Sequence, residues 1–181
     1  EAGGLAGLAG WSVRRIAKAA GIGMGAASRV AAAVEVAHRI EAGPWRPGIL
    51  LDCPALVMRH YRAVLRGRTQ EVCLAALLNS RHRLIRDVVV ATGGLTQCIV
   101  EPREVYGHAL RDGAAGIVVV HNHPSGDPEP SADDAVLCRR LAECGTVLGV
   151  PMRDFIVVAV GGSFSFASKG LLDDALPRAA D

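Results

Sequence analysis

The sequence predicts an α+β protein in which a mixed β-sheet flanked by helices follows a small helical segment. Three observations predict this class. Apolar residues recur at helical spacing in residues 1–42, residues 43–48 contain paired prolines and glycines, and β-branched runs alternate with helical stretches in residues 49–181. Some of these runs follow one another directly and others are separated by helices, which indicates a mixed sheet rather than a purely parallel one.

The composition favours a folded protein outside the membrane. The chain has 181 residues, enough for one domain and a small appendage. Half of the residues are hydrophobic, with a mean hydropathy of +0.28, but apolar runs such as residues 117–120 are far shorter than the ~18 needed to span a bilayer. The 21% of charged residues and the net charge of +2 argue against disorder.

The compartment is predicted from the cysteines. The five cysteines include no Cys-x-x-Cys pair, which suits a reducing compartment, and no signal-peptide pattern is visible. The chain begins at Glu1 rather than Met, as an excised fragment would. We therefore expect a cytoplasmic protein with no membrane partner.

The helical segment is expected to comprise residues 1–42, joined by a linker at residues 43–48 to a larger unit at 49–181. Ser12 can cap a helix that ends near Ala20, and Val30, Val34 and Ile40 recur at helical spacing in a second helix. Residues 1–48 hold six basic and three acidic residues, so this part is positively charged while the remainder is nearly neutral.

In the larger unit, each element is predicted from its local pattern. Pro54 and Pro102 suit the first turns of helices, and Gly161-Gly162 suits the turn of a closing hairpin. The expected helices are 54–65, 102–110 and 131–144, and the expected strands are 71–78, 84–90, 96–100, 116–121, 155–160 and 163–166.

The stretch His121-Asn-His-Pro-Ser-Gly-Asp-Pro indicates a metal site. Histidines two residues apart on a strand point to the same side and can share one ion. Asp134 lies on the helix that follows a proline-rich loop, and this loop can bring its carboxylate close to the two imidazoles. Two histidines and a carboxylate leave a coordination position open, as in catalytic zinc sites. Ser131 and Asp134 also fit a helix capping box, and both interpretations can hold together.

This spacing matches the JAMM (MPN+) metalloprotease motif, and the string His121–Pro128, with Pro102-Arg103-Glu104-Val105 upstream, resembles the bacterial RadC family with its JAB domain. The resemblance covers roughly residues 50–170 and implies a JAB/MPN, cytidine-deaminase-like fold. It also implies a peptide or protein substrate and one Zn²⁺ per chain held by His121, His123 and Asp134. Ser131 would lie beside the zinc-bound water and donate a hydrogen bond to the developing oxyanion.

The resemblance further implies that Glu71 is the catalytic glutamate. From the residues alone, Glu71 is a solvated carboxylate at a strand end. Glu104 is its competitor, but the first turn of a predicted helix accounts for a carboxylate there. Cys138 stands where the family commonly has threonine, and Asp154-Phe155 where it has an Asp-His pair. The remaining histidines, His38, His60, His82 and His108, are expected at the surface.

A second signal lies in Ala20-Gly-Ile-Gly23, which resembles the helix-hairpin-helix motif found before the JAB domain in RadC proteins. Gly21 and Gly23 would let the backbone approach a DNA phosphate, and Arg29 would add sequence-independent attraction, so weak non-specific DNA binding is expected. The alternative is a helical packing module in which the glycines only make the turn.

Three functions follow from the sequence. The favoured one is zinc-dependent hydrolysis of a peptide or isopeptide bond. The alternatives are a DNA repair or recombination accessory protein, and a zinc-stabilised interaction module without turnover. Nothing in the sequence selects a natural substrate or an oligomeric state.

Overall fold

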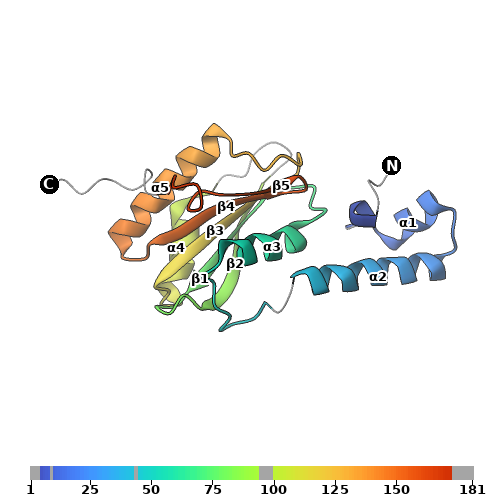
Figure 1. The fold of residues 1–181 in the computed structure, drawn as a ribbon, viewed down its shortest axis with the longest axis horizontal. Helices are drawn as coiled ribbons and strands as arrows, with labels where there is room; N and C mark the ends of the chain where they lie inside the picture. Colours follow the sequence, from blue (N-terminus) through green and yellow to red (C-terminus); the bar gives the residue numbers. More distant parts are fainter. Residues whose placement is uncertain (1–4, 9, 43–44, 94–99, 173–181) are drawn as a thin grey trace.

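The computed structural model describes residues 5–8, 10–42, 45–93 and 100–172. The helices and strands follow one another as η1 (Leu5–Leu8), α1 (Val13–Ala20), α2 (Met24–Ala42), α3 (Pro54–Leu65), β1 (Val72–Leu78), β2 (Leu84–Thr92), α4 (Pro102–Arg111), β3 (Gly116–His123), α5 (Ala132–Leu148), β4 (Met152–Ala159) and β5 (Gly162–Ser165). A mixed sheet lies between α3 on one face and α4 and α5 on the other (Figure 1). The predicted α+β class is confirmed.

The sheet has the strand order β2-β1-β3-β4-β5. Strand β1 is antiparallel to both β2 and β3, whereas β3 and β4 are parallel and are connected through α5. A parallel pair needs such a crossover, because a tight turn can join only antiparallel strands. Strands β4 and β5 form the expected closing hairpin.

The central strands decide which side chains reach each face. Strands β1 and β3 are buried almost throughout, as expected for strands covered on both faces. Along β3, Ile117 and Val119 pack in the core beneath α4 and α5, while Val118 and Val120 pack in the core beneath α3. The same alternation carries His121 and His123 to the α5 face and Asn122 to the α3 face.

Several elements differ from the predicted ranges. Strand β4 begins at Met152, three residues before the predicted start, because pairing with β3 extends the strand through two charged residues. Strand β3 continues to His123 for the same reason. The short helix η1 was not predicted. The expected strand at 96–100, apart from Val100, and Cys98 lie outside the described residues.

The segment after α2 is anchored on the larger unit by Trp45. Its ring stacks on His60 at a centroid distance of 3.8 Å, and its Nε1–H donates to Asp87 Oδ2 at 2.7 Å. Tyr61 Oη donates to the other Asp87 oxygen at 2.5 Å. The prediction of a surface His60 is therefore wrong, because the residue is only 5% exposed beneath Trp45.

The other three histidines expected at the surface differ from one another. His82 is exposed as predicted, and His108 is half-buried. The side chain of His38 lies outside the described part of the chain.

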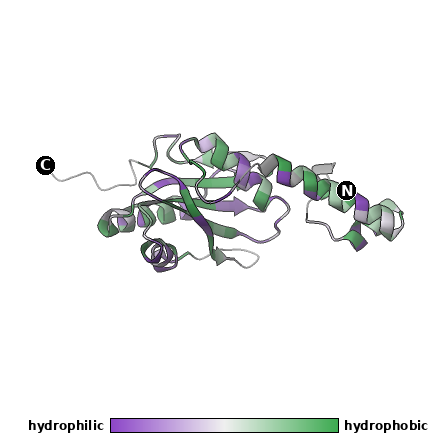
Figure 2. Ribbon diagram, turned by 90° about the horizontal axis from the view of Figure 1, so that it is seen from below, coloured by the Kyte–Doolittle hydropathy of each residue, from purple (hydrophilic) through white to green (hydrophobic). Residues whose placement is uncertain are grey.

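Helices α1 and α2 extend beyond one end of the sheet, and hydrophobic and hydrophilic positions are mixed along them (Figure 2). Among the described residues, no single helix is both long and apolar enough to cross a bilayer. Taken together, α1 and the first part of α2 are long and apolar enough, but the two helices are bent by 116° relative to each other.

Candidate metal centre

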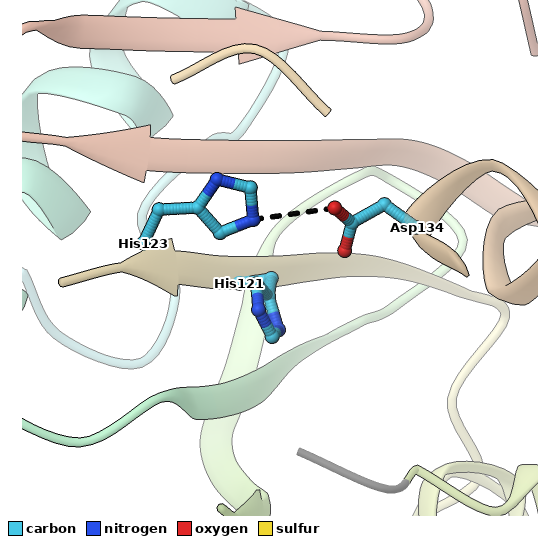
Figure 3. A group of neighbouring side chains, drawn as sticks. All are labelled: His121, His123 and Asp134. Atoms are coloured by element: carbon cyan, nitrogen blue, oxygen red, sulfur yellow. Dashed lines mark ion pairs between the residues drawn. The ribbon is translucent and has the colours of Figure 1, made fainter. Parts of the chain in front are cut away.

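The candidate site lies where the end of β3 meets the start of α5. His121 and His123 extend from β3 on the side that faces Asp134, and Asp134 comes from the first turn of α5 (Figure 3). His123 Nε2 lies 3.2 Å from Asp134 Oδ2. One potential ligand atom from each of the three residues lies within 4.8 Å of the others. The structure thus brings together the three predicted ligands.

Asp134 is held by the helix cap that the sequence also suggested. Its Oδ2 accepts hydrogen bonds from the backbone N–H of Ser131 at 2.7 Å and from the Ser131 hydroxyl at 2.6 Å. Ser131 Oγ in turn accepts from the Asp134 backbone N–H at 3.1 Å, which completes a capping box. The cap fixes the carboxylate beside the histidines, and the start of a helix favours a negative charge there.

The charges in the cluster are coupled. Burial alone would raise the pKa of Asp134, but hydrogen bonds from His123 and Ser131 outweigh it and lower the pKa to about 2. The hydrogen bond with Asp134 raises the pKa of His123. Burial lowers the pKa of His121, which favours its neutral form. A carboxylate and a neutral imidazole are the forms that bind a cation.

The residues fit a zinc ion. His123 Nε2 lies 3.2 Å from Asp134 Oδ2 and His121 Nε2 lies 3.8 Å from Glu71 Oε2, so both rings turn this nitrogen towards the acidic groups of the site. His123 Nδ1 lies 3.0 Å from the Asp127 carbonyl oxygen. A hydrogen on that Nδ1 leaves the lone pair of Nε2 directed at the cluster. Two imidazoles and one carboxylate are a common catalytic zinc set.

Glu71 lies next to the cluster, directly before β1. Its Oε2 is 3.8 Å from His121 Nε2, and its side chain is 28% exposed. The antiparallel pairing of Cys73 with His121 brings the start of β1 to this position. Glu104, in the first turn of α4, is 52% exposed, contacts Arg103 and is not among the residues that line the cavity at the cluster. Of the two glutamates, only Glu71 lies where it can reach a reacting group there.

Asn122 holds the backbone on both sides of Glu71, and the sequence reasoning missed it. Its Oδ1 accepts from the Val72 backbone N–H at 2.6 Å, and its Nδ2 donates to the Gln70 carbonyl at 3.2 Å. The side chain is buried on the α3 face, between the two histidines in sequence. A buried asparagine in a His-x-His segment was the available signal, because buried amides need hydrogen-bond partners.

The cluster opens into a cavity of about 600 Å³. Its walls include the three candidate ligands, Glu71 and Ser131, together with three more carboxylates from Asp127, Glu129 and Asp133. Asp127 and Glu129 are exposed. The site is therefore accessible to a substrate and strongly acidic on this side.

The two departures from the family pattern do not form the walls of this cavity. Cys138 is buried in the core beneath α5, where burial raises the pKa of its thiol to about 12. Phe155 is buried in the same core. Burial raises the pKa of its neighbour Asp154, which accepts hydrogen bonds from Ser165 Oγ at 2.6 Å and from the Ala167 N–H at 2.9 Å. Asp154 thus holds the segment after β5.

The residues predicted to bind DNA belong to the segment of α1 and α2 (Figure 1), and none of them lines the cavity at the metal cluster. Gly21 ends α1 in the left-handed region, with φ of 64°. A Cβ on Gly21 or Gly23 would meet nothing within 4 Å, and Arg29 is exposed on α2.

Comparison with known proteins identifies the family. The family model of the RadC-like JAB domain matches residues 51–171. A UPF0758 protein of Geobacter sulfurreducens is 39% identical over 178 residues, which cover 95% of this chain and 76% of that protein. A UPF0758 protein of Syntrophotalea carbinolica is 41% identical over 152 residues, 84% of this chain and 67% of that protein. The chain therefore belongs to the RadC-like JAB domain family.

Proposed function

We propose that this chain is a zinc-dependent hydrolase that cleaves a peptide or isopeptide bond. The observation that carries the proposal is the position of Glu71, 3.8 Å from His121 Nε2 and outside the set of three candidate ligands. A carboxylate that is near the metal but not needed to hold it is what a general base requires. Membership of the JAB domain family, which includes metalloproteases, supports the same function.

In this proposal His121, His123 and Asp134 hold the metal. Bound zinc supplies a Lewis acid and lowers the pKa of water towards about 7. The Glu71 carboxylate accepts a proton from the attacking water and returns it to the leaving amine. Ser131 donates a hydrogen bond to the oxyanion that develops on the substrate carbonyl, for which its hydroxyl hydrogen must turn away from Asp134 Oδ2.

The test compares two glutamates by the same isosteric change. Glu71→Gln should bind zinc normally and lose about 10²–10⁴ in turnover, because only proton transfer is removed. Glu104→Gln should keep its turnover and lose at most about 1 kcal/mol of stability, as expected for an exposed carboxylate in the first turn of a helix. Zinc content and hydrolysis of a panel of peptides and isopeptide-linked conjugates are measured for both variants and the wild type.

If only Glu104→Gln loses turnover, Glu104 rather than Glu71 is the general base. Equal turnover in both variants and the wild type would remove the glutamate from the mechanism. A wild-type protein that binds zinc and cleaves no member of the panel would favour the interaction module without turnover.

A second candidate function is weak, sequence-independent DNA binding by α1 and α2. It is favoured by the open surface around Gly21 and Gly23, where no atom lies within 4 Å of an added Cβ. The exposed side chains of Arg14, Arg15 and Lys18 on α1 add positive charge to the same segment. Together they would allow close approach of the backbone to a phosphate and attraction to it.

Fluorescence anisotropy with a labelled DNA duplex at several salt concentrations tests this second function. Each neutralised phosphate contributes about −0.9 to the slope of log K against log salt, so Arg29→Gln should make the slope about one unit shallower. Arg81→Gln, an exposed arginine in the turn between β1 and β2, is the control. Equal slopes and affinities in both variants and the wild type would exclude Arg29 from a DNA site.

A further inference from the structure

A second cavity, of about 540 Å³, adjoins the metal cluster on the other side of His123. We call it the arginine cavity, because Arg62, Arg66 and Arg68 line it at the end of α3 and just after it. The opposite wall comes from the residues around His123 on β3 and from the end of β4. His123 lines both cavities, so this candidate ligand forms a wall that they share.

The two cavities carry opposite charge. None of the described residues that line the arginine cavity is acidic. The cavity at the metal cluster has five carboxylates, from Glu71, Asp127, Glu129, Asp133 and Asp134. The described residues of this wall include one arginine, Arg140, which is paired with Glu101 at 2.8 Å. The charged side chains that line the two cavities are therefore mostly of opposite sign.

The arginines are suited to bind carboxylates. A guanidinium has five N–H donors in a planar fork that matches a carboxylate. Arg62 is half-buried and donates to the Val160 carbonyl at 3.5 Å, which holds its head group at the cavity wall while other donors can meet a ligand. Arg68 is exposed at the rim.

We propose that the arginine cavity binds the acidic part of a peptide substrate whose scissile bond lies at the metal cluster. This rests on the proposed hydrolase function and assigns the substrate class: peptides with acidic side chains, or a terminal carboxylate, on one side of the bond. The cavity at the metal cluster is acidic, so it admits neutral or basic residues on the other side of the scissile bond.

A nucleic acid fits this arrangement less well. A phosphate backbone that crosses His123 would place negative charge against Glu71, Asp127, Glu129 and Asp133 in the acidic cavity. Like charges brought together in this way oppose binding. A peptide can change the sign of its charge from one residue to the next, whereas a nucleic-acid backbone cannot.

Peptide binding to the zinc-loaded Glu71→Gln protein tests the inference, because binding needs no turnover. The probes are fluorescent peptides of equal length in which one flank is rich in Asp, rich in Lys or neutral. The Asp-rich peptide should bind most tightly. The double variant Arg62→Gln/Arg68→Gln should lower the affinity for this peptide by about fivefold per arginine. Such a factor corresponds to a binding free energy near the upper end for an exposed ion pair. Its affinity for the neutral peptide should not change.

Two further variants control for the position and the charge of the arginines. Arg59→Gln removes an exposed arginine of α3 that does not line the cavity, and it should bind the Asp-rich peptide as the parent does. Arg62→Lys/Arg68→Lys keeps the positive charge and should retain most of the preference. Thermal melts and zinc content establish that each variant is folded and loaded.

Three results of the binding experiment would overturn the proposal. They are an unchanged affinity of the Asp-rich peptide in the double variant, a preference for the Lys-rich peptide, and tighter binding of a DNA oligonucleotide that is lost in the same variant. Failure of the hydrolase function is a separate result, namely a wild-type protein that cleaves none of these peptides. If the wild type cleaves them and the arginine variants cleave equally well, the hydrolase stands and this inference fails.

Discussion

Replacing Asn122 by alanine should destabilise the protein and loosen the backbone that carries Glu71. The substitution removes the acceptor of the buried Val72 N–H and the donor to the Gln70 carbonyl. An unsatisfied buried N–H costs about 1–3 kcal/mol and a lost partly exposed hydrogen bond about 1 kcal/mol. We therefore expect the free energy of unfolding to fall by about 2–4 kcal/mol, which leaves most domains folded.

Asn79→Ala is the matched control. The Asn79 side chain also makes two hydrogen bonds to the backbone, but in an exposed turn: its Oδ1 accepts from the N–H groups of Arg81 at 2.9 Å and Arg83 at 3.1 Å. Water can replace the lost acceptor there, so the loss should stay below about 1 kcal/mol.

Urea unfolding of zinc-free and zinc-loaded protein, together with hydrogen exchange at the Val72 amide, measures the effect. The Asn122 variant should unfold at lower urea with an unchanged slope, and the Val72 amide should exchange faster than in the wild type. The zinc content should be unchanged, whereas turnover should fall because Glu71 is less well positioned. Equal losses of stability for Asn122→Ala and Asn79→Ala, or an unchanged Val72 exchange rate, would refute this reasoning.

Two further predictions concern packing. Gly145→Ala should lower stability by roughly 1–3 kcal/mol in urea unfolding, because the new Cβ would lie 2.5 Å from Tyr106 Oη and 2.7 Å from the Val150 carbonyl oxygen. A stabilised variant, as expected for Gly→Ala at an exposed helix position, would contradict the packing. Trp45→Phe should lose about 1.5 kcal/mol by removing the hydrogen bond to Asp87, and Trp45→Ala should lose more because the stack on His60 also disappears. Equal losses in the two Trp45 variants would show that the ring stack contributes little.

Local signals were sufficient for the features that depend on neighbours in sequence. The helix at 54–65 was predicted with its observed bounds, since Pro54 begins it and the apolar spacing continues to Leu65. The period of two along a strand predicted that His121 and His123 share a face, and the Ser131–Asp134 spacing predicted the observed capping box.

Features set by pairing between distant segments could not be predicted in the same way. Glu71 is near His121 because β1 pairs with β3 in one register, and the residues alone did not separate it from Glu104. The buried position of His60 depends on Trp45 folding back from the linker, so its polar neighbours in sequence suggested a surface group. Asn122 acquires its role only when the segment before β1 lies beside β3.

Elemental analysis of purified protein tests the metal site most directly. After purification without chelators and loading with zinc, the wild type should hold about one zinc ion per chain, as expected for a single set of three protein ligands. His121→Ala and His123→Ala should abolish binding, Asp134→Ala should weaken it strongly, and the exposed His82→Ala should retain the full content. Absence of zinc from the wild type, or the same zinc content in all four variants, would contradict the assignment of the site.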